Sequence, residues 1–350
     1  MPYTSTEAMF FKVATLAQLG EFDEIIDVRS PSEFAEDHIP GASSCPVLDD
    51  DERARVGTLY CQQSPFAARR VGAALVARNI AHHIESRFHD RPKSWRPLIY
   101  CWRGGQRSAA MALVLGQVGW AAHQLEKGYK GYRQQVLADL DRLPADIDFR
   151  VLTGPTGSGK SRLLDALAYQ GRQVLDLERL ACHRGSVLGQ VPGQTQPSQK
   201  AFETGLCQAL AAFDPAQPVY VEAESRHIGR LTLPNALLAA MHCAPSIRLV
   251  VPLPERVRFL LQDYAFLTEN PALLQQQLDR LKTLYPREQW ETWHALIQAG
   301  RYAELVQVLL ERHYDPLYLR ATGKHFTVET RTLSLADIGE SALGHAASML

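Results

Sequence analysis

The sequence predicts two α/β domains, each built on a parallel sheet, followed by a helical C-terminal region. Short apolar segments with strand character alternate with amphipathic helical segments in both halves of the chain, which is typical of doubly wound parallel sheets. From residue 255 onward, leucine and aromatic residues recur at three- and four-residue spacing, which indicates helices. We expect a first domain over 10–135, a second over 149–254, and a helical region over 255–350 that packs on the second domain.

Each expected element has its own signal. Strands are predicted where four or five mostly apolar residues end at a loop, and helices where apolar residues recur with helical spacing. In the first half the strands are 24–28 and 97–101 and the helix is 107–118. In the second half the strands are 150–153, 173–177, 218–222 and 247–251 and the helix is 161–169. Residues 136–148 contain a helix end and a proline and form the expected connector.

Composition excludes several classes of protein. The 350 residues are 46% hydrophobic and 21% charged, which is enough apolar material for packed cores and excludes general disorder. We find no signal peptide and no apolar run near the ~18 residues that a membrane-spanning helix needs. The six cysteines form no CxxC pair, which excludes a disulfide scaffold or a zinc site and favours the cytoplasm. A net charge of −1 gives no indication of a nucleic-acid partner.

The strongest motif opens the second half. Residues 154–161, GPTGSGKS, fit the P-loop pattern G-x-x-x-x-G-K-[ST] between a predicted strand and a predicted helix. Glycines let backbone N–H groups point inward, and the helix N-terminus adds partial positive charge, so we expect a polyphosphate here. Lys160 is expected at the terminal phosphates and Ser161 as a ligand of Mg²⁺. The candidate diphosphate-binding residues are Gly154, Gly157, Gly159, Lys160 and Ser161.

Carboxylates follow two strands of the second half. Glu222 and Glu224 lie at the end of one strand and are candidates for holding a metal ion through water, with solvated surface carboxylates as the alternative. Asp176 and Glu178 follow the preceding strand and are candidates for contact with an acceptor substrate. A helix cap is the alternative role for Asp176.

A second motif surrounds Cys101, which directly follows an apolar strand and precedes the helix 107–118. Backbone N–H groups at a helix N-terminus and two nearby guanidinium groups stabilise a thiolate and attract an anion. Cys101 is therefore the candidate nucleophile, and the other five cysteines are interpreted as structural. The candidate anion-binding residues are Arg103, Gly104, Gly105 and Arg107.

This loop, together with Asp27-Val-Arg29 and His38-Ile-Pro-Gly-Ala42, resembles the rhodanese (sulfurtransferase) family over residues 10–135. The resemblance implies a cysteine that carries a persulfide, and structural roles for Asp27, Arg29 and His38. The loop has the spacing C-x5-R, one residue longer than the C-x4-R usual in rhodaneses, and a wider loop suits a tetrahedral oxyanion or selenium. C-x5-R is also the spacing of cysteine phosphatases, so phosphatase activity is an alternative for this half.

Segments from both halves resemble the tRNA 2-selenouridine synthase family, in which a rhodanese-like domain is joined to a P-loop NTPase-like domain. The matching segments are 100–108, 125–133, 154–161, 176–186, 196–199, 202–203, 221–229 and 313–316. The resemblance implies a transferase that geranylates a wobble 2-thiouridine of tRNA with geranyl diphosphate held on the P-loop. It further implies that selenium from selenophosphate, carried as a Cys101 perselenide, replaces the S-geranyl group.

The same resemblance implies a tRNA partner and a supply of selenophosphate. The P-loop makes Mg²⁺ the candidate cofactor, and from the sequence we expect no membrane partner and a monomeric protein. Basic and aromatic residues, together with residues after strand ends, are the candidate tRNA contacts, with ordinary solvated surface as the alternative. These residues are Lys127, Tyr129, Lys130, Tyr132, Arg133, His183, Arg184 and Arg226.

Two other functions stay open from the sequence. One is an ATP-dependent kinase or NTPase that carries a phosphatase-like domain. The other is a sulfur-relay adaptor that passes a persulfide to a partner and only binds a nucleotide.

Overall fold

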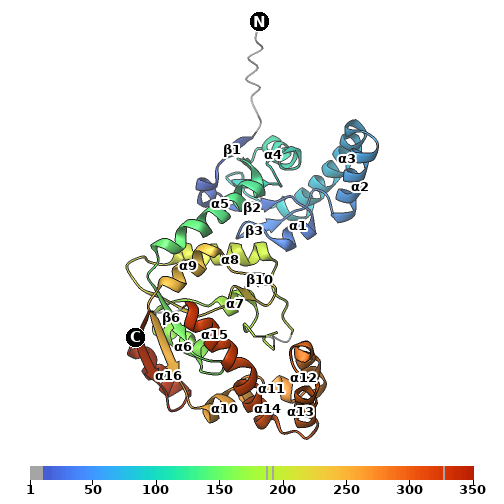
Figure 1. The fold of residues 1–350 in the computed structure, drawn as a ribbon. Coiled ribbons are helices and arrows are strands. Elements are labelled where there is room, and N and C mark those ends of the chain that lie inside the picture. The colour runs from blue at the N-terminus through green and yellow to red at the C-terminus, as the bar shows by residue number, and fades with distance from the viewer. Residues whose placement is uncertain (1–10, 187, 191–192, 326–327) are drawn as a thin grey trace. The chain divides into compact units, whose positions relative to one another are not determined.

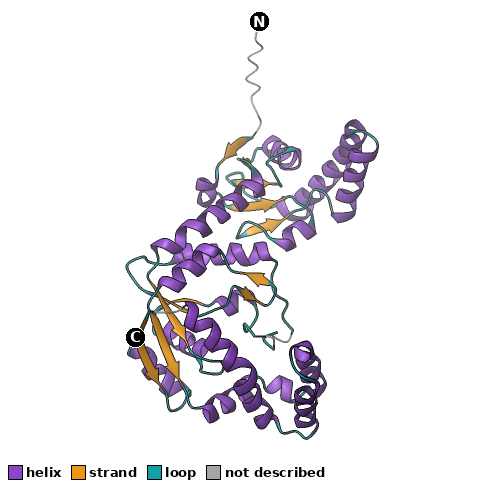
Figure 2. Ribbon diagram, viewed as in Figure 1, coloured by secondary structure: helices purple, strands orange, loops and turns teal. Residues whose placement is uncertain are grey.

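The computed structural model describes residues 11–186, 188–190, 193–325 and 328–350, and the chain divides between Ala138 and Asp139 into two compact units (Figure 1). Each unit contains one five-stranded sheet with helices packed around it (Figure 2). The predicted class, two α/β domains with parallel sheets, is confirmed. Among the described residues, no helix is long and apolar enough to span a membrane.

The sheet of the first unit has the order β1-β5-β4-β2-β3, and all its strand pairs are parallel. The strands are β1 (Lys12–Ala14), β2 (Glu24–Asp27), β3 (Ala42–Ser44), β4 (Pro97–Tyr100) and β5 (His123–Leu125). The helices are η1 (Leu16–Glu21), α1 (Pro31–Glu36), α2 (Asp50–Gln62), α3 (Pro65–His83), η2 (Ile84–Phe88), α4 (Gln106–Val118) and α5 (Gly128–Arg142). The predicted strands 24–28 and 97–101 and the helix 107–118 are present within one residue at each end.

The central strand β4 shows why this sheet is covered on both faces. Its side chains alternate between faces, as in any strand, and all four residues are buried. Ile99 packs with Met111 of α4 in one core cluster, whereas Leu98 and Tyr100 pack with Tyr129 of α5 in another. A strand that is apolar on both faces is typical of a parallel sheet between helical layers.

The structural roles expected for Asp27, Arg29 and His38 are confirmed. Arg29 is 1% exposed, and its guanidinium forms a two-pronged ion pair with Asp27 at 2.7–3.1 Å. Its Nη2 also donates to the carbonyl of Asp37, which fixes the turn after α1. His38 stacks on Phe34, and its Nδ1 lies 3.0 Å from the carbonyl oxygen of that residue.

The sheet of the second unit has the order β12-β11-β6-β8-β7 and is also parallel throughout. The strands are β6 (Phe149–Thr153), β7 (Gln173–Leu175), β8 (Val219–Glu222), β11 (Ser246–Val250) and β12 (Glu329–Ser334), and β9 (His227–Ile228) pairs with β10 (Leu231–Thr232) in a small hairpin. The helices around them are η3 (Leu143–Asp146), α6 (Lys160–Tyr169), α7 (Leu177–Ala181), α8 (Gln199–Ala212), α9 (Asn235–Cys243) and α16 (Glu340–Ser348).

The remaining helices of this unit follow β11. They are α10 (Leu253–Asp263), α11 (Ala265–Thr268), α12 (Pro271–Leu278), η4 (Asp279–Leu284), α13 (Arg287–Gln298), α14 (Tyr302–Leu309), η5 (Leu310–Tyr314) and α15 (Asp315–His325). Leucines at helical spacing, among them Leu274, Leu278 and Leu281, form one core cluster with Trp293. The spacing signal therefore predicted these helices correctly.

The helical C-terminal region predicted over 255–350 also contains one strand that the sequence did not predict. Residues 329–334 form the edge strand β12, which pairs in parallel with β11. Leu333 of this strand packs in the same cluster as Leu343 and Ala347 of α16 and Leu163 of α6. The end of the chain therefore completes the second sheet.

Candidate functional site

The P-loop connects the central strand β6 to helix α6, as the sequence predicts. Gly157 and Gly159 have φ angles of 81° and 78°, a backbone conformation that residues other than glycine rarely adopt. A Cβ atom on Gly157 would lie 2.9 Å from Cδ1 of Leu260 in α10. Glycine therefore allows the loop both to turn and to lie directly against α10.

Three later residues hold the loop in shape. Arg256 of α10 donates from Nε to the carbonyl of Thr156 at 2.9 Å and forms a bidentate ion pair with Asp315 at 2.6 and 2.9 Å. The Gly154 N–H donates to the hydroxyl of Tyr318. Asp315 belongs to the segment 313–316 that carries part of the family resemblance, and the structure gives this residue a specific task.

A cavity of about 930 Å³ opens beside the P-loop. Gly157, Gly159, Lys160, Ser161, Glu222, Glu224, Arg184 and Arg226 line it and are residues singled out from the sequence. The Nζ of Lys160 donates to the carbonyl of Gly154 at 2.9 Å, so the ammonium group lies along the loop. Four of the five predicted loop residues thus share one cavity with the candidate carboxylates at the end of β8 and after it.

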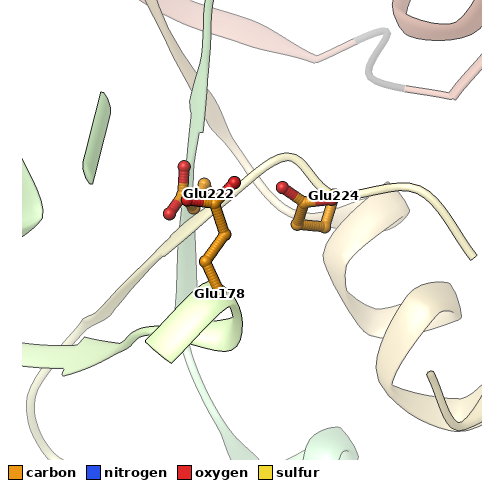
Figure 3. A group of neighbouring side chains, drawn as sticks. All are labelled: Glu178, Glu222 and Glu224. Carbon is orange, nitrogen blue, oxygen red and sulfur yellow. The ribbon is translucent and has the colours of Figure 1, made fainter. Parts of the chain in front are cut away.

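Three glutamates that line this cavity are neighbours of one another (Figure 3). Glu178 extends from α7 toward Glu222 at the end of β8, and Glu224 lies on the segment that follows β8. One oxygen from each carboxylate lies within 4.8 Å of the others. The hydroxyl of Ser161 lies 3.3 Å from Glu178 Oε2 and 3.4 Å from Glu222 Oε2. The first residue after the P-loop lysine therefore touches the acidic group.

Burial and mutual repulsion raise the pKa of all three carboxyl groups. For Glu222, which is 1% exposed, the main cause is loss of solvent, and the neighbouring charge of Glu178 adds to it. Loss of solvent also raises the pKa of Glu178 and Glu224, helped by the charge of another glutamate of the trio. The positive charge of Lys160 opposes the rise in each case. The cluster therefore holds protons at a pH where an ordinary glutamate is ionised.

The donor set fits a hard divalent cation. The group offers only oxygen ligands, from three carboxylates and one hydroxyl, and Mg²⁺ prefers oxygen ligands. Glu222 Oε1 is buried and has no hydrogen-bond partner. A buried carboxylate oxygen without a partner is costly, and a cation would satisfy it.

The second candidate centre is the Cys101 loop between β4 and α4. The Sγ of Cys101 accepts hydrogen bonds from the Gly105 N–H at 3.2 Å and from the Ser108 hydroxyl at 3.1 Å. Gln124 of β5 donates from Nε2 to the same hydroxyl at 2.8 Å, and the Ser108 hydroxyl has a second acceptor in the Gly105 carbonyl at 3.2 Å. The donors at the start of α4 thus point at the thiol, as the motif predicts.

The segment 125–133 proves to be a support for this loop. The N–H groups of Tyr129 and Lys130, at the start of α5, donate to the carbonyls of Cys101 and Trp102, both at 2.8 Å. Gly128 has a φ angle of 53°, and a Cβ atom there would lie 2.2 Å from the carbonyl oxygen of Cys101. Only glycine lets α5 approach the cysteine loop so closely.

The two arginines of the loop differ in their surroundings. Arg107 donates to Glu33 of α1 at 3.0 Å, and the charge of Arg107 helps to keep the pKa of Glu33 below its usual value despite burial. Arg103 is exposed. Cys101 itself is only 3% exposed and belongs to a core cluster with Ile99 and Met111.

The structure decides the role of two candidate residues: Asp176 has its alternative role as a helix cap, and Tyr129 lies in the core. Asp176 is the N-cap of α7, where its carboxylate accepts the Arg179 N–H at 2.8 Å, and it does not line the cavity that Glu178 lines. Tyr129 is 1% exposed; its hydroxyl donates to Asp37 at 2.7 Å, and the guanidinium of Arg29 covers its ring at 3.9 Å. The proposed tRNA contact of Tyr129 is therefore wrong, because its ring is part of the core.

The other candidate tRNA contacts are of mixed character. Lys127, Lys130 and Arg226 are exposed, whereas Tyr132 and Arg133 are half-buried. His183 is 9% exposed. Arg184 pairs with Asp263 at 2.7 Å and lies over the ring of Tyr264 at 4.9 Å. RNA contact by these residues stays a prediction.

Sequence reasoning missed the loop supports Arg256 and Tyr318 and gave Glu178 no part in a metal site. The position of Glu178, in the first turn of a helix after a strand, was visible in the sequence. Nothing in the sequence pattern showed that the side chain of Glu178, and not that of Asp176, faces the cavity. Arg256 and Tyr318 lie about a hundred residues or more from the loop, so only the fold brings them to it.

Comparisons with known proteins agree with these two centres. Residues 147–298 match the model of the tRNA 2-selenouridine synthase AAA domain, and residues 12–135 match the rhodanese-like domain. The tRNA 2-selenouridine synthase of Aeromonas salmonicida is 35% identical over 332 residues, which cover 85% of this chain and 87% of that protein. The chain belongs to the tRNA 2-selenouridine synthase family.

Further relatives of that name are similar over shorter or equal spans. The protein of Nitrosomonas europaea is 38% identical over 70% of this chain and 64% of its own length. The protein of Alcanivorax borkumensis is 33% identical over 84% of this chain and 88% of its own. The family resemblance identified from motifs is thereby confirmed, and it includes both halves of the chain.

Proposed function

We propose that this chain is an enzyme that converts wobble 2-thiouridine of tRNA into 2-selenouridine through an S-geranyl intermediate. The observation that carries the proposal is membership of the synthase family over 85% of the chain, with the P-loop and the Cys101 loop both intact. Each loop has the chemistry of one step. The P-loop suits a diphosphate, and the cysteine loop suits a tetrahedral anion such as selenophosphate.

The first step is alkylation of sulfur. The thiocarbonyl sulfur of the base attacks C1 of geranyl diphosphate, a C–S bond forms, and the C–O bond breaks with its electron pair on the departing diphosphate. The base loses its N3 proton and becomes a thioimidate, whose sulfur leaves more readily than sulfide.

The residues around the P-loop stabilise the charge that develops on the diphosphate. The Lys160 ammonium turns from the Gly154 carbonyl to the phosphates, and the backbone N–H groups of the loop and of α6 add fixed dipoles. Mg²⁺, held by Ser161, Glu178 and Glu222, would supply further positive charge beside the leaving group. Ionisation of the glutamates is favoured when such a charge is near.

The second step exchanges sulfur for selenium, and counting electrons constrains it. Selenium in selenophosphate is at the oxidation level of selenide, the level it has in the product. If the Cys101 thiolate instead attacked selenium to form a perselenide, the phosphorus would leave as phosphite. A thiol would then be needed later to reduce the bond between sulfur and selenium. Attack of the Cys101 thiolate on phosphorus forms an S–P bond, and the electrons of the Se–P bond leave with hydrogen selenide.

We therefore write the step as attack on phosphorus, with the perselenide implied by the family as the alternative. Gly105 N–H and Ser108 stabilise the thiolate before attack. Hydrogen selenide adds to C2 of the S-geranyl base, its proton moves to N3, and geranyl thiolate leaves and is protonated. Water then releases phosphate and restores the thiol of Cys101.

The test combines the purified full-length chain with tRNA bearing 2-thiouridine, geranyl diphosphate, selenophosphate and Mg²⁺. We expect mass spectrometry of the nucleosides to show 2-selenouridine, and S-geranyl-2-thiouridine alone when selenophosphate is omitted. Phosphate as the phosphorus product supports attack on phosphorus, whereas phosphite would establish the perselenide. Absence of both nucleosides, together with ATP turnover that needs no tRNA, would overturn the proposal in favour of an NTPase.

A further inference from the structure

A small apolar pocket lies in the second unit, beside the helices that follow β11. Its volume is about 60 Å³, and its walls come from α10, α11, α12, α14 and η5. Leu260, Leu261, Tyr264, Leu274, Leu305 and Tyr314 are among the residues that line it. Core packing normally fills such a space between leucines, so a space that stays open is a candidate ligand site.

This pocket adjoins the P-loop cavity. Thr156 of the P-loop, Leu260, Tyr264 and Tyr314 line both spaces. Leu260 touches the loop at Gly157, the glycine whose missing Cβ lets α10 come near. A ligand with its anionic end on the P-loop therefore has an apolar space within reach, along one wall formed by α10.

The lining decides between two kinds of ligand. A purine or pyrimidine base carries several hydrogen-bond donors and acceptors, and burying them unpaired is costly. Leucine side chains make up most of this pocket, and its polar groups are hydroxyls of Thr156, Ser186, Thr268 and tyrosines. A hydrocarbon chain brings no hydrogen-bonding group of its own into such a place.

We infer that this pocket binds the hydrocarbon end of the prenyl diphosphate whose diphosphate lies on the P-loop, and that its depth sets the accepted chain length. The inference rests on the proposed function, in which geranyl diphosphate is the donor. A space of about 60 Å³ has room for roughly four or five water-sized probes, so it takes the branched tip of a hydrocarbon chain and not a whole chain. The terminal isoprene unit enters the pocket, and the unit next to the diphosphate lies along Leu260.

The test changes the size of the pocket in both directions. Leu261 is half-buried on α10 and lines the pocket but not the P-loop cavity. We expect Leu261→Trp to lower kcat/KM for geranyl diphosphate by roughly tenfold or more while dimethylallyl diphosphate still reacts. Leu261→Ala should raise kcat/KM for farnesyl relative to geranyl diphosphate. Leu284→Trp, on an exposed leucine of η4, is the matched control and should leave the preference unchanged.

Binding measurements separate pocket effects from damage to the fold. Inorganic diphosphate reports on the P-loop alone, and its affinity by calorimetry should be the same in all four proteins. Should Leu261→Trp lose diphosphate binding, Val306→Phe, on α14, tests the other wall.

The two proposals fail in different ways. The pocket assignment would be overturned if the wild-type protein prenylates tRNA and the variants Leu261→Trp, Leu261→Ala and Val306→Phe keep its chain-length preference. Wild-type protein that transfers no prenyl group from any of the three donors would overturn the proposed first step, and with it this inference.

Discussion

The cysteine loop of the first unit and the P-loop of the second are built from the same parts. Each follows the central strand of a five-stranded parallel sheet, which is β4 in the first unit and β6 in the second. Each leads into a helix whose first N–H groups point toward the loop. The place is the usual ligand site of an open α/β sheet. The two loops differ in what their donors face.

The donors of the first loop are directed at a side chain of the protein itself. Gly105 N–H and Ser108 bond to Cys101, and Arg107 pairs with Glu33. The second loop opens on a cavity of about 930 Å³, and its lysine is bonded only to a loop carbonyl among the contacts described. In the first loop the donors are therefore already bonded to the candidate nucleophile, whereas in the second the cavity leaves room for a ligand beside the donors.

The largest expected effect comes from a substitution that removes the function of the first loop alone. Cys101→Ser should lower selenium incorporation by roughly a factor of 10³ or more, because a hydroxyl is a far weaker nucleophile than a thiolate. S-geranyl tRNA should accumulate, since only the second step uses the thiol. Nucleoside mass spectrometry measures both products, and Cys61→Ser, at an exposed cysteine of α2, is the control. Loss of the S-geranyl product as well would contradict the division of labour.

The complementary change breaks the second loop. Lys160→Ala should reduce geranyl transfer by about 10²–10³-fold, because the charge on the departing diphosphate loses its nearest cation. Pre-formed S-geranyl tRNA should still be converted by this variant when selenophosphate is present. Lys93→Ala, at an exposed lysine of the first unit, should behave as the wild type. Geranyl transfer at the normal rate in Lys160→Ala would exclude the P-loop from the first step.

Gly128→Ala sharpens the comparison by disturbing a support rather than a functional group. The new Cβ overlaps the Cys101 carbonyl and sits at a positive φ, so we expect a loss of about 2–4 kcal/mol in the free energy of unfolding of the first unit. Selenium incorporation should fall with it, while geranyl transfer persists. Gly41→Ala has a positive φ but no atom within 4 Å, and should cost only about 1–2 kcal/mol. Equal losses in urea titrations of the two variants would refute the close approach of α5.

The smallest effect concerns the glutamates of the second loop and appears as a pH dependence. Folding raises the pKa of Glu222 above the ordinary 4.5, so the folded chain keeps a proton that the unfolded chain releases. The free energy of unfolding should therefore fall as the pH rises from 4.5 into the neutral range, in protein kept free of metal with EDTA. Glu222→Gln should flatten that fall, and the exposed Glu269→Gln should not. Parallel Tm-against-pH curves for wild type and Glu222→Gln would show that this carboxyl does not store a proton.

Local signals in the sequence predicted both sheets and both loops, because buried parallel strands are apolar runs and each loop needs its glycines. The edge strand β12 was not predicted, since five of its six residues are polar and Leu333 is its one apolar residue. The choice of Glu178 over Asp176 depends on which side of α7 faces the cavity. Tyr129 looked like a surface aromatic among basic residues, but the packing of α5 on the sheet buries it. Such outcomes depend on contacts between distant segments.

The hydrogen bonds that Arg256 donates and Tyr318 accepts determine how far the P-loop domain can be shortened without losing the support of its loop. The phosphate loop starts at Gly154, but the side chains that hold its backbone continue to Tyr318, well past residue 298 where the match to the AAA-domain model ends. A fragment cut at that boundary keeps the whole GPTGSGKS motif yet lacks Asp315 and Tyr318. A fragment that keeps the P-loop together with all of these supporting side chains therefore contains nearly the entire second unit.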